Sequence, residues 1–379
     1  MLRNVTQAEP KCAEHAFATI QGRLARRLAR RLRLAALGLL VMHVSCSLIL
    51  SPSFARAYEG DSEAEQQIKA AGLSVPAFRA LVQACAASKT DAIVLLRHGQ
   101  VVVCRPSGQQ MVRLPLRSVT KSIVSLAIGA LIAEGKIRSL DTPVSFWFPE
   151  WATGRKAKVT LRHILEHTSG LEHEAGDGQM MSQTDVIAYV RRLPLVSEPG
   201  SQFSYNGEAT MLLSGIIRSA AGESVSRYLD RRLFAPMGIT DWHWDQDRAS
   251  NDLTHTGLEL KPIDLARIGQ LMMDQGQWNG RQLIPAEWIQ ASTRPSLRRP
   301  DYGLLWWLLR RRDGTVIGFN GNGWLGQHLV VYPTAGVVAV RMRRGSATPT
   351  DQENQEFGLL RFPFLVRDLF KQNGPKPAK

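Results

Sequence analysis

A serine and a lysine three positions apart, Ser118 and Lys121, are the residues of this chain best placed to do chemistry. They stand at the start of a largely apolar run, 123–132, that predicts a helix, and side chains three apart on a helix share one face, with about 5 to 6 Å between Cβ atoms. A serine hydroxyl becomes an effective nucleophile when an adjacent base accepts its proton, and a lysine amine can be that base. The positive end of the helix dipole would stabilise a developing oxyanion. The spacing therefore indicates acyl transfer, with a capped helix start and a solvated lysine as the purely structural alternative.

The sequence blocks around and after Ser118 keep the order found in one enzyme family. The stretch 117–140, RSVTKSIVSLAIGALIAEGKIRSL, resembles the penicillin-binding-protein-like serine hydrolases, which include class C β-lactamases, D,D-peptidases, esterases and 6-aminohexanoate-oligomer hydrolases. The resemblance covers roughly residues 90–345, and six further blocks carry it: LDTPV at 140–144, HTSGL at 167–171, PGSQFSYN at 199–206, APMGI at 235–239, DLARIGQL at 264–271 and GQWNG at 276–280. Ordered blocks are more specific than any single motif.

The resemblance implies a third catalytic residue, Tyr205. In the family, a tyrosine from the helical domain faces the serine–lysine pair and relays a proton to the leaving group. Tyr205 precedes a helix-like run, 211–221, and ring packing with a satisfied hydroxyl is its structural alternative. The penicillin-binding members usually carry Tyr-x-Asn or Tyr-x-Ser, whereas this chain has Gly207 in the third place. The amide that orients a β-lactam or peptide side chain is therefore missing or supplied by Asn206.

The last family element is a strand that carries Lys or His, then Thr or Ser, then Gly, and recognises a substrate carboxylate. The corresponding stretch, 318–327, reads GFNGNGWLGQ and has no basic residue. A backbone oxyanion hole survives this change, and we expect it to use the Ser118 N–H and an N–H near Asn322 or Gly323, with Gly321 in the same strand. Loss of the cation favours ester or linear-amide substrates over β-lactams and D,D-peptides. A glycine hairpin without chemistry is the structural alternative.

Together these residues predict a serine hydrolase that acts on an amide or ester bond through an acyl-enzyme at Ser118. Lys121 would be the general base, Tyr205 would pass the proton to the leaving group, and water would then release the acyl group. We expect no cofactor, and a small-molecule or short-peptide-like amide or ester substrate. A β-lactamase, a D,D-peptidase, or a non-turnover penicillin-binding or sensor protein on the same fold remains the alternative. The sequence leaves the substrate and the oligomeric state open.

A competing pattern lies at 163–167, where HILEH matches the H-x-x-E-H motif of inverted zinc peptidases. Two histidines at i and i+4 on one helix face could hold zinc, with Glu166 as the base and His173 or Glu174 as a third ligand. The residues that follow fit the serine-hydrolase block instead, and Gly170 is expected to end the helix. We therefore expect no metal site.

The first 57 residues predict export. A basic cluster, 23–33, is followed by a mostly apolar run, 34–50, and by an A-x-A site at 55–57, which together are typical of an export signal. The mature chain would begin near Tyr58 and be periplasmic or extracellular, without a stable membrane span. An uncleaved N-terminal anchor is the alternative, because the apolar run is just inside the spanning range.

Composition sets the outer limits of the interpretation. A chain of 379 residues with 44% hydrophobic and 21% charged side chains is ordinary for a globular enzyme. Half of the net charge of +14 lies in residues 1–57, and basic residues interleaved with aromatic ones do not stand out, so a nucleic-acid partner is not expected. Cleavage would leave Cys85 and Cys104, which could pair in an oxidising compartment or serve as small buried apolar residues.

The pattern of elements indicates mixed α and β structure. Two β-like runs, 92–97 and 100–104, predict a hairpin joined by His98 and Gly99. We further expect a helix over 76–88, a helix-rich stretch over about 140–270, β-like runs at 304–310, 327–332 and 336–342, and a final helix over 356–370. The resemblance implies an α+β, beta-lactamase/transpeptidase-like fold: an antiparallel sheet from both chain ends, flanked by helices, with an inserted helical domain inside residues 58–375. The site would lie between the two parts.

Overall fold

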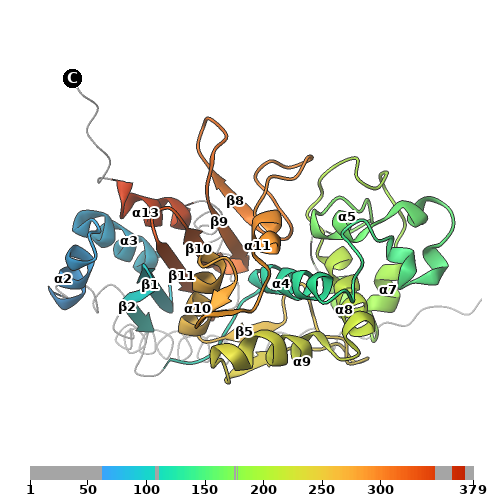
Figure 1. The fold of residues 1–379 in the computed structure, drawn as a ribbon, viewed down its shortest axis with the longest axis horizontal. Coiled ribbons are helices and arrows are strands. Elements are labelled where there is room, and N and C mark those ends of the chain that lie inside the picture. The colour runs from blue at the N-terminus through green and yellow to red at the C-terminus, as the bar shows by residue number, and fades with distance from the viewer. Residues whose placement is uncertain (1–61, 107–110, 175, 177, 346–360, 372–379) are drawn as a thin grey trace, which may run out of the picture. The chain divides into compact units, whose positions relative to one another are not determined.

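A six-stranded antiparallel sheet is the framework of the fold (Figure 1). The computed structural model describes residues 62–106, 111–174, 176, 178–345 and 361–371, so the predicted export segment lies outside it. All described residues belong to one compact unit, Phe54–Lys379. The strand order is β2 (Gln100–Pro106), β1 (Ala92–Arg97), β11 (Val337–Met342), β10 (Gln327–Tyr332), β9 (Val316–Gly323) and β8 (Trp307–Arg310). The predicted sheet from both ends of the domain is confirmed.

Side chains along the strands alternate between two cores. On β1, Val94 and Leu96 belong to the larger core, whereas Ile93 and Leu95 belong to the smaller one. Strands β10 and β11 are buried at every position, because they are central and both of their faces are covered. The smaller core lies under α2 (Ser62–Ala70), α3 (Val75–Ala87) and α13 (Phe362–Asp368), and the larger one under α4 (Val119–Ala133), α10 (Pro262–Met273) and α11 (Ala286–Ser292).

Helix α4 runs through the larger core. All of its residues from 119 to 131 are buried, as expected of a helix that is apolar around its whole circumference. Its two serines, Ser122 and Ser125, donate hydrogen bonds of 2.7 and 2.8 Å to the carbonyls of residues 305 and 304. A Cβ at Gly129 would lie 2.1 Å from the ring of Trp288 on α11, so only glycine permits this packing. The helix that begins at the candidate nucleophile is therefore fixed along its length.

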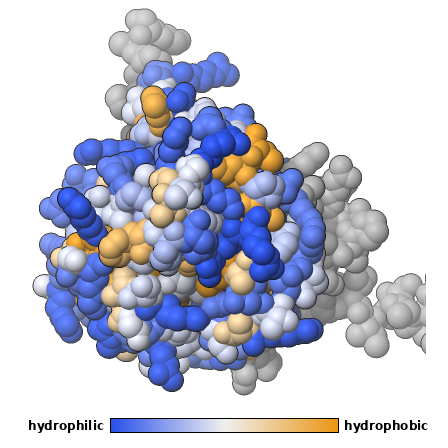
Figure 2. All heavy atoms as spheres, turned by 90° about the vertical axis from the view of Figure 1, so that its right-hand side faces the viewer, coloured by the Kyte–Doolittle hydropathy of each residue, from blue (hydrophilic) through white to orange (hydrophobic). Residues whose placement is uncertain are grey.

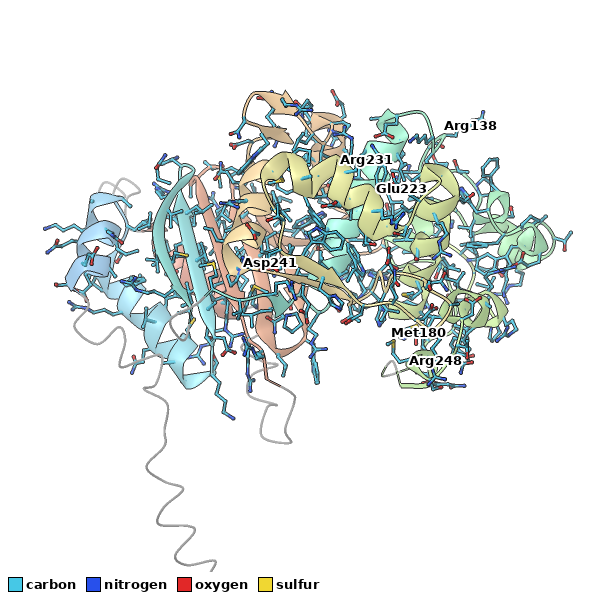
Figure 3. All side chains as sticks on the ribbon, turned by 90° about the horizontal axis from the view of Figure 1, so that it is seen from below. Arg138, Met180, Glu223, Arg231, Asp241 and Arg248 are labelled. Atoms are coloured by element: carbon cyan, nitrogen blue, oxygen red, sulfur yellow. The ribbon has the colours of Figure 1, made fainter. Side chains whose placement is uncertain are left out.

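The middle of the chain supplies the helical region. It contains α5 (Leu161–Leu165), α6 (Gly178–Met181), α7 (Val186–Arg192), α8 (Gly207–Ala221) and α9 (Val225–Leu229). The face of the molecule on this side is largely hydrophilic, with small hydrophobic areas between charged residues (Figure 2). Glu223 and Arg231, an ion pair of 2.6 Å, lie side by side at its surface (Figure 3). The expected insertion over 140–270 ends earlier than predicted, because α10 packs on β1, β10 and β11, with Gly269 against Leu329 and Val338.

A small sheet of β3 (Leu114–Pro115), β5 (Leu258–Leu260) and β4 (Trp242–Trp244) leads into α4 and α10. Asp241, labelled in Figure 3, accepts hydrogen bonds from Arg113 and from Lys261, and these two cations lower the pKa of its carboxyl. Within the described ranges, no helix is both long and apolar enough to cross a membrane.

The two cysteines outside the export segment do not form a disulfide. Both are free thiols, with Cys85 on α3 and Cys104 on β2. Cys85 belongs to the smaller core, while Cys104 packs against the larger one, so the sheet lies between them. Burial raises the pKa of Cys85 to about 11, which keeps it a protonated thiol at neutral pH. Of the two alternatives left by the sequence, the structure shows the unpaired one.

Candidate active site

Ser118 and Lys121 meet at the first turn of α4. Ser118 is the N-cap residue, and its Oγ accepts a hydrogen bond of 3.0 Å from Lys121 Nζ. The same amine donates a 2.7 Å hydrogen bond to the backbone carbonyl of His255. Lys121 is only 3% exposed, so both of these oxygens hold its amine in a buried position. The arrangement leaves a serine hydroxyl in contact with a fixed nitrogen base.

Tyr205 lies beside this pair, directly before the N-cap of α8. The Lys121 amine is 5.2 Å from the centroid of the Tyr205 ring. The ring stacks on Trp307 of β8 at 6.0 Å and packs against His167 at 4.5 Å. Three elements distant in the sequence thus fix the phenol next to Lys121. The sequence did not single out Trp307, because its place beside Tyr205 depends on a long-range strand contact.

His167 is a buried member of the site that the sequence presented only as a candidate zinc ligand or as a helix-end residue. Its Nδ1 accepts a 3.1 Å hydrogen bond from the backbone N–H of Asn206, so the neutral ring carries its proton on Nε2. Burial, and then the positive charge of Lys121, lowers the pKa of His167 well below its usual value. His167 therefore stays neutral at neutral pH.

The structure does not have the helical geometry that the zinc alternative requires. Helix α5 ends at Leu165, and His167 lies beyond it with φ = 53°, so the two histidines are not on one helix face. His163 Nδ1 accepts from the N–H of Thr160 in a capping box, and His173 bonds to Ser204 at 2.7 Å. Among the residues that the structure places, no group of three His, Cys, Asp or Glu side chains could hold a metal ion.

The Asn206 side chain has a structural role in the fold. Its Oδ1 accepts from the N–H of Ala209 at 2.7 Å as the N-cap of α8, and its Nδ2 donates to the carbonyl of Leu171 at 2.9 Å. The residue is 1% exposed, so both ends of the amide are committed to the fold. Of the two alternatives left by the sequence, these contacts favour a missing amide over one supplied by Asn206. The third place of the motif is Gly207, with no side chain to offer.

The glycines of β9 allow the strand to approach the nucleophile. A Cβ at Gly323 would lie 2.6 Å from the Leu116 carbonyl oxygen and 3.1 Å from the Ser118 backbone nitrogen, and a Cβ at Gly321 would lie 3.0 Å from Val119 Cγ1. The end of β9 thus runs directly beside the start of α4. This brings the backbone of the strand near the Ser118 N–H.

Asn322 points away from this approach. It pairs with His328 of β10, and His328 stacks on Phe362 of α13 on the smaller-core side of the sheet. Paired residues share one face of a sheet, so the Asn322 side chain lies opposite Gly321 and Gly323. Only its backbone can contribute to an oxyanion hole.

A buried arginine holds the turn that follows β9. Arg341 of β11 donates to the carbonyls of Leu325 at 3.0 Å and Gly326 at 2.6 Å, and also to Ser88 and Thr90. It is completely buried, and burial lowers its pKa to about 10. The sequence did not identify Arg341, because an arginine in an apolar strand gives no sign of which carbonyls it will meet.

No basic side chain takes the place of the family's strand cation within the described part of β9. Asn320, which precedes Gly321, is 1% exposed and pairs with His328 at 3.1 Å. The next side chain at the end of the strand is Trp324, which is 44% exposed and lies under the guanidinium of Arg117 at 5.6 Å. The site is therefore bordered by an aromatic surface instead of a lysine.

Comparisons with known proteins agree on one family. Residues 78–360 match the beta-lactamase family. The chain is 34% identical over 186 residues to esterase EstB from Burkholderia gladioli, a match that covers 43% of this chain and 47% of that protein, about half of its length. It is 24% identical to 6-aminohexanoate-dimer hydrolase from Paenarthrobacter ureafaciens, over 67% of this chain and 72% of that one.

The fold agrees as well. A penicillin-binding protein from Bacillus halodurans superimposes with a TM-score of 0.58 at 19% identity, over 72% of this chain and 97% of that one. At this identity the likeness establishes the fold alone. The sequence match and the fold lead to the same conclusion. The chain belongs to the beta-lactamase family.

Proposed function

We propose that this protein is a serine hydrolase that cleaves an ester or linear amide through an acyl-enzyme at Ser118. The observation that carries the proposal is the 3.0 Å contact between Ser118 Oγ and the buried Lys121 Nζ, beside the phenol of Tyr205. Relatives named as an esterase and as an aminohexanoate-dimer hydrolase support the reaction class.

The proposed reaction has two halves. Lys121, as the neutral amine, accepts the Ser118 proton while Oγ attacks the carbonyl carbon, and the backbone N–H of Ser118 with one from the end of β9 stabilises the oxyanion. The Tyr205 hydroxyl gives its proton to the leaving alcohol or amine and recovers one from Lys121. Water then attacks the acyl-enzyme, and Ser118 regains its proton.

Two features favour esters and linear amides over β-lactams and D,D-peptides. The strand stretch that would bind a substrate carboxylate, 318–327, has no basic residue, and the position that would orient an amide side chain is Gly207. Both features also motivate the second candidate, a penicillin-binding or sensor protein that acylates once and does not turn over.

We also propose that the protein is exported. The support is the sequence of residues 1–57 alone, in which a basic cluster, an apolar run and an A-x-A site follow one another. The mature enzyme would then act in the periplasm or outside the cell.

A substrate panel tests the reaction class. We would measure turnover of p-nitrophenyl butyrate, a 6-aminohexanoate dimer and nitrocefin, with Ser118→Ala as the control variant. Hydrolysis of the ester or linear amide, little nitrocefin turnover and an inactive variant are the expected results. Rapid nitrocefin hydrolysis would favour a β-lactamase, a single covalent addition without turnover would favour the sensor, and loss of activity with EDTA that zinc restores would return the case to the histidines at 163–167.

A further inference from the structure

A cavity lies at the end of the sheet remote from Ser118. It has a volume of about 750 Å³, within the range of small-molecule sites. Its lining comes from the end of β1, the start of β9, the turn between β10 and β11, and the C-terminal end of α13. Val316 lines it at one end of β9, whereas Gly323 adjoins Ser118 at the other, seven residues or about 23 Å away at ~3.3 Å per residue.

The cavity is strongly cationic. Arg97, Arg311, Arg367 and Lys371 all line it. Asp368 lies 3.5 Å from Arg367 Nη2 and 3.9 Å from Lys371 Nζ, and Asp313 interacts electrostatically with Arg311. The two Asp368 distances are longer than a charge-assisted hydrogen bond. Four cations therefore outnumber the two carboxylates described beside them, and part of the positive charge outside the export segment is concentrated here.

Two of these guanidinium groups have buried donors that the described residues leave unsatisfied. Arg97 Nε and Nη1 and Arg367 Nε are inaccessible to solvent and have no hydrogen-bond partner among the placed atoms. Buried polar groups are nearly always paired, and leaving one without a partner destabilises the fold, more so when the group is charged. Both side chains line the same cavity, so two guanidinium groups with incomplete hydrogen bonding adjoin it.

The rest of the lining is mostly apolar, with two threonines, Thr315 and Thr334. Tyr332 and Phe370 pack edge to face at 5.0 Å, and the Tyr332 hydroxyl is committed to the carbonyl of Pro363 at 2.8 Å. Val316 and Ile317 add aliphatic surface from β9. A ligand here would meet fixed apolar walls beside a cluster of guanidinium groups.

We propose that this cavity binds an amphipathic organic anion. Its carboxylate is held by Arg97 and Arg367, and its apolar body, a short alkyl chain or one aromatic ring, lies against Tyr332, Phe370 and Val316. Guanidinium groups suit a carboxylate because their donors match its two oxygens. The binding site is separate from the hydrolase site and does not depend on its activity.

Calorimetric titration of the full chain with octanoate tests the proposal. The Ser118→Ala background removes turnover, and octanamide and inorganic phosphate supply only the apolar or only the anionic half of the ligand. We expect octanoate to bind more tightly than either, and Arg97→Gln with Arg367→Gln to weaken it at least about tenfold, since a hydrogen bond to a charged group is worth about 1.5–3 kcal/mol. Arg312→Gln, an exposed arginine beside the cavity residue Arg311, is the matched control and should change affinity less than twofold.

Three results would overturn the proposal: no binding of octanoate up to millimolar concentration, equal affinity for phosphate, or affinity unchanged in the double variant. The last result would place octanoate at the catalytic site. If the double glutamine variant does not fold, Arg97→Lys with Arg367→Lys is the second test. It keeps the positive charges but removes the paired donors of the guanidinium groups, and it should still weaken binding. Hydrolysis of p-nitrophenyl butyrate by the double variant with Ser118 intact should match the parent, so failure of the cavity and failure of the hydrolase are distinguishable.

Discussion

The Lys121 amine donates hydrogen bonds to two oxygens, the Ser118 hydroxyl at 3.0 Å and the His255 carbonyl at 2.7 Å. The first contact follows from the spacing of two residues on one helix, so the sequence could predict it. The second joins residues 134 positions apart and depends on the tertiary fold. The same holds for Trp307 and His167 around Tyr205, whose roles are visible only once the strands and loops are placed.

At Tyr205 we predict that removal of the hydroxyl impairs turnover while the ring keeps its packing. Tyr205→Phe retains the contacts with Trp307 and His167, so stability should change little, but kcat should fall by about 10²- to 10⁴-fold because proton transfer is lost. Steady-state kinetics on p-nitrophenyl butyrate measure this. Tyr228→Phe, which removes a hydroxyl bonded to Glu134 away from the site, is the control. A Tyr205→Phe enzyme within a few-fold of the parent would assign the proton transfer to another group.

His167 should make stability depend on pH. Its pKa is lowered in the folded state, chiefly by burial and then by Lys121, and burial also lowers the pKa of His163. Below about pH 6.5 the unfolded chain binds protons at these histidines that the folded chain excludes, so the free energy of unfolding falls as pH falls. Each histidine contributes up to about 1.4 kcal/mol per pH unit. We would measure the free energy of unfolding in urea at several pH values between about pH 7 and pH 5. It should fall less steeply with decreasing pH in His167→Gln than in the parent or in exposed His243→Gln. An equal pH dependence in all three proteins would contradict a buried neutral His167.

At the scale of elements, strand β9 and helix α4 form the site because glycine lets their backbones meet. The sequence located both elements, and the predicted strands at 327–332 and 336–342 correspond closely to β10 and β11. The sequence predicted a strand that starts at residue 304, whereas β8 starts at Trp307. The N–H groups of Leu304 and Leu305 donate to the carbonyls of Ser292 and Leu165 instead of to a neighbouring strand. Patterning predicts which residues are apolar, but not which backbone groups a distant segment will take.

Gly323→Ala tests the close approach. The φ of Gly323 is −134°, which alanine adopts freely, so the substitution adds only a Cβ that would meet the Leu116 carbonyl at 2.6 Å. The strand must shift away from Ser118, and we expect kcat/KM to fall by about 10²-fold or more, the loss typical of one oxyanion donor. Gly178→Ala, with open space around its Cβ, should retain full activity. Parental activity in Gly323→Ala would show that the end of β9 takes no part in stabilising the oxyanion.

At the scale of the whole molecule, the sheet joins the two ends of the domain, so β1 and β11 pair although the paired residues are 240 to 250 positions apart along the chain. Composition and patterning indicate only mixed α and β structure; the ordered family blocks predict this topology. The cationic cavity had no signal in the sequence, because its arginines come from three separate segments.

The proposed export signal predicts where the full chain is cleaved and where the protein is recovered. Expressed with its first 57 residues in a bacterial host, the protein should be recovered outside the cytoplasm with Tyr58 as its first residue, because the A-x-A site precedes it. N-terminal sequencing of the periplasmic fraction measures this. An intact N-terminus in the membrane fraction would instead indicate an uncleaved anchor.

The measurement that tests the central claim most directly is the mass of the protein during turnover of a slowly deacylated p-nitrophenyl ester. An acyl-enzyme mechanism predicts a burst of p-nitrophenol close to one equivalent and a mass increase of one acyl group, located by peptide mapping on Ser118. Ser118→Ala should show neither, with an unchanged unfolding midpoint. An adduct on another residue, or turnover by a correctly folded Ser118→Ala protein, would contradict the account.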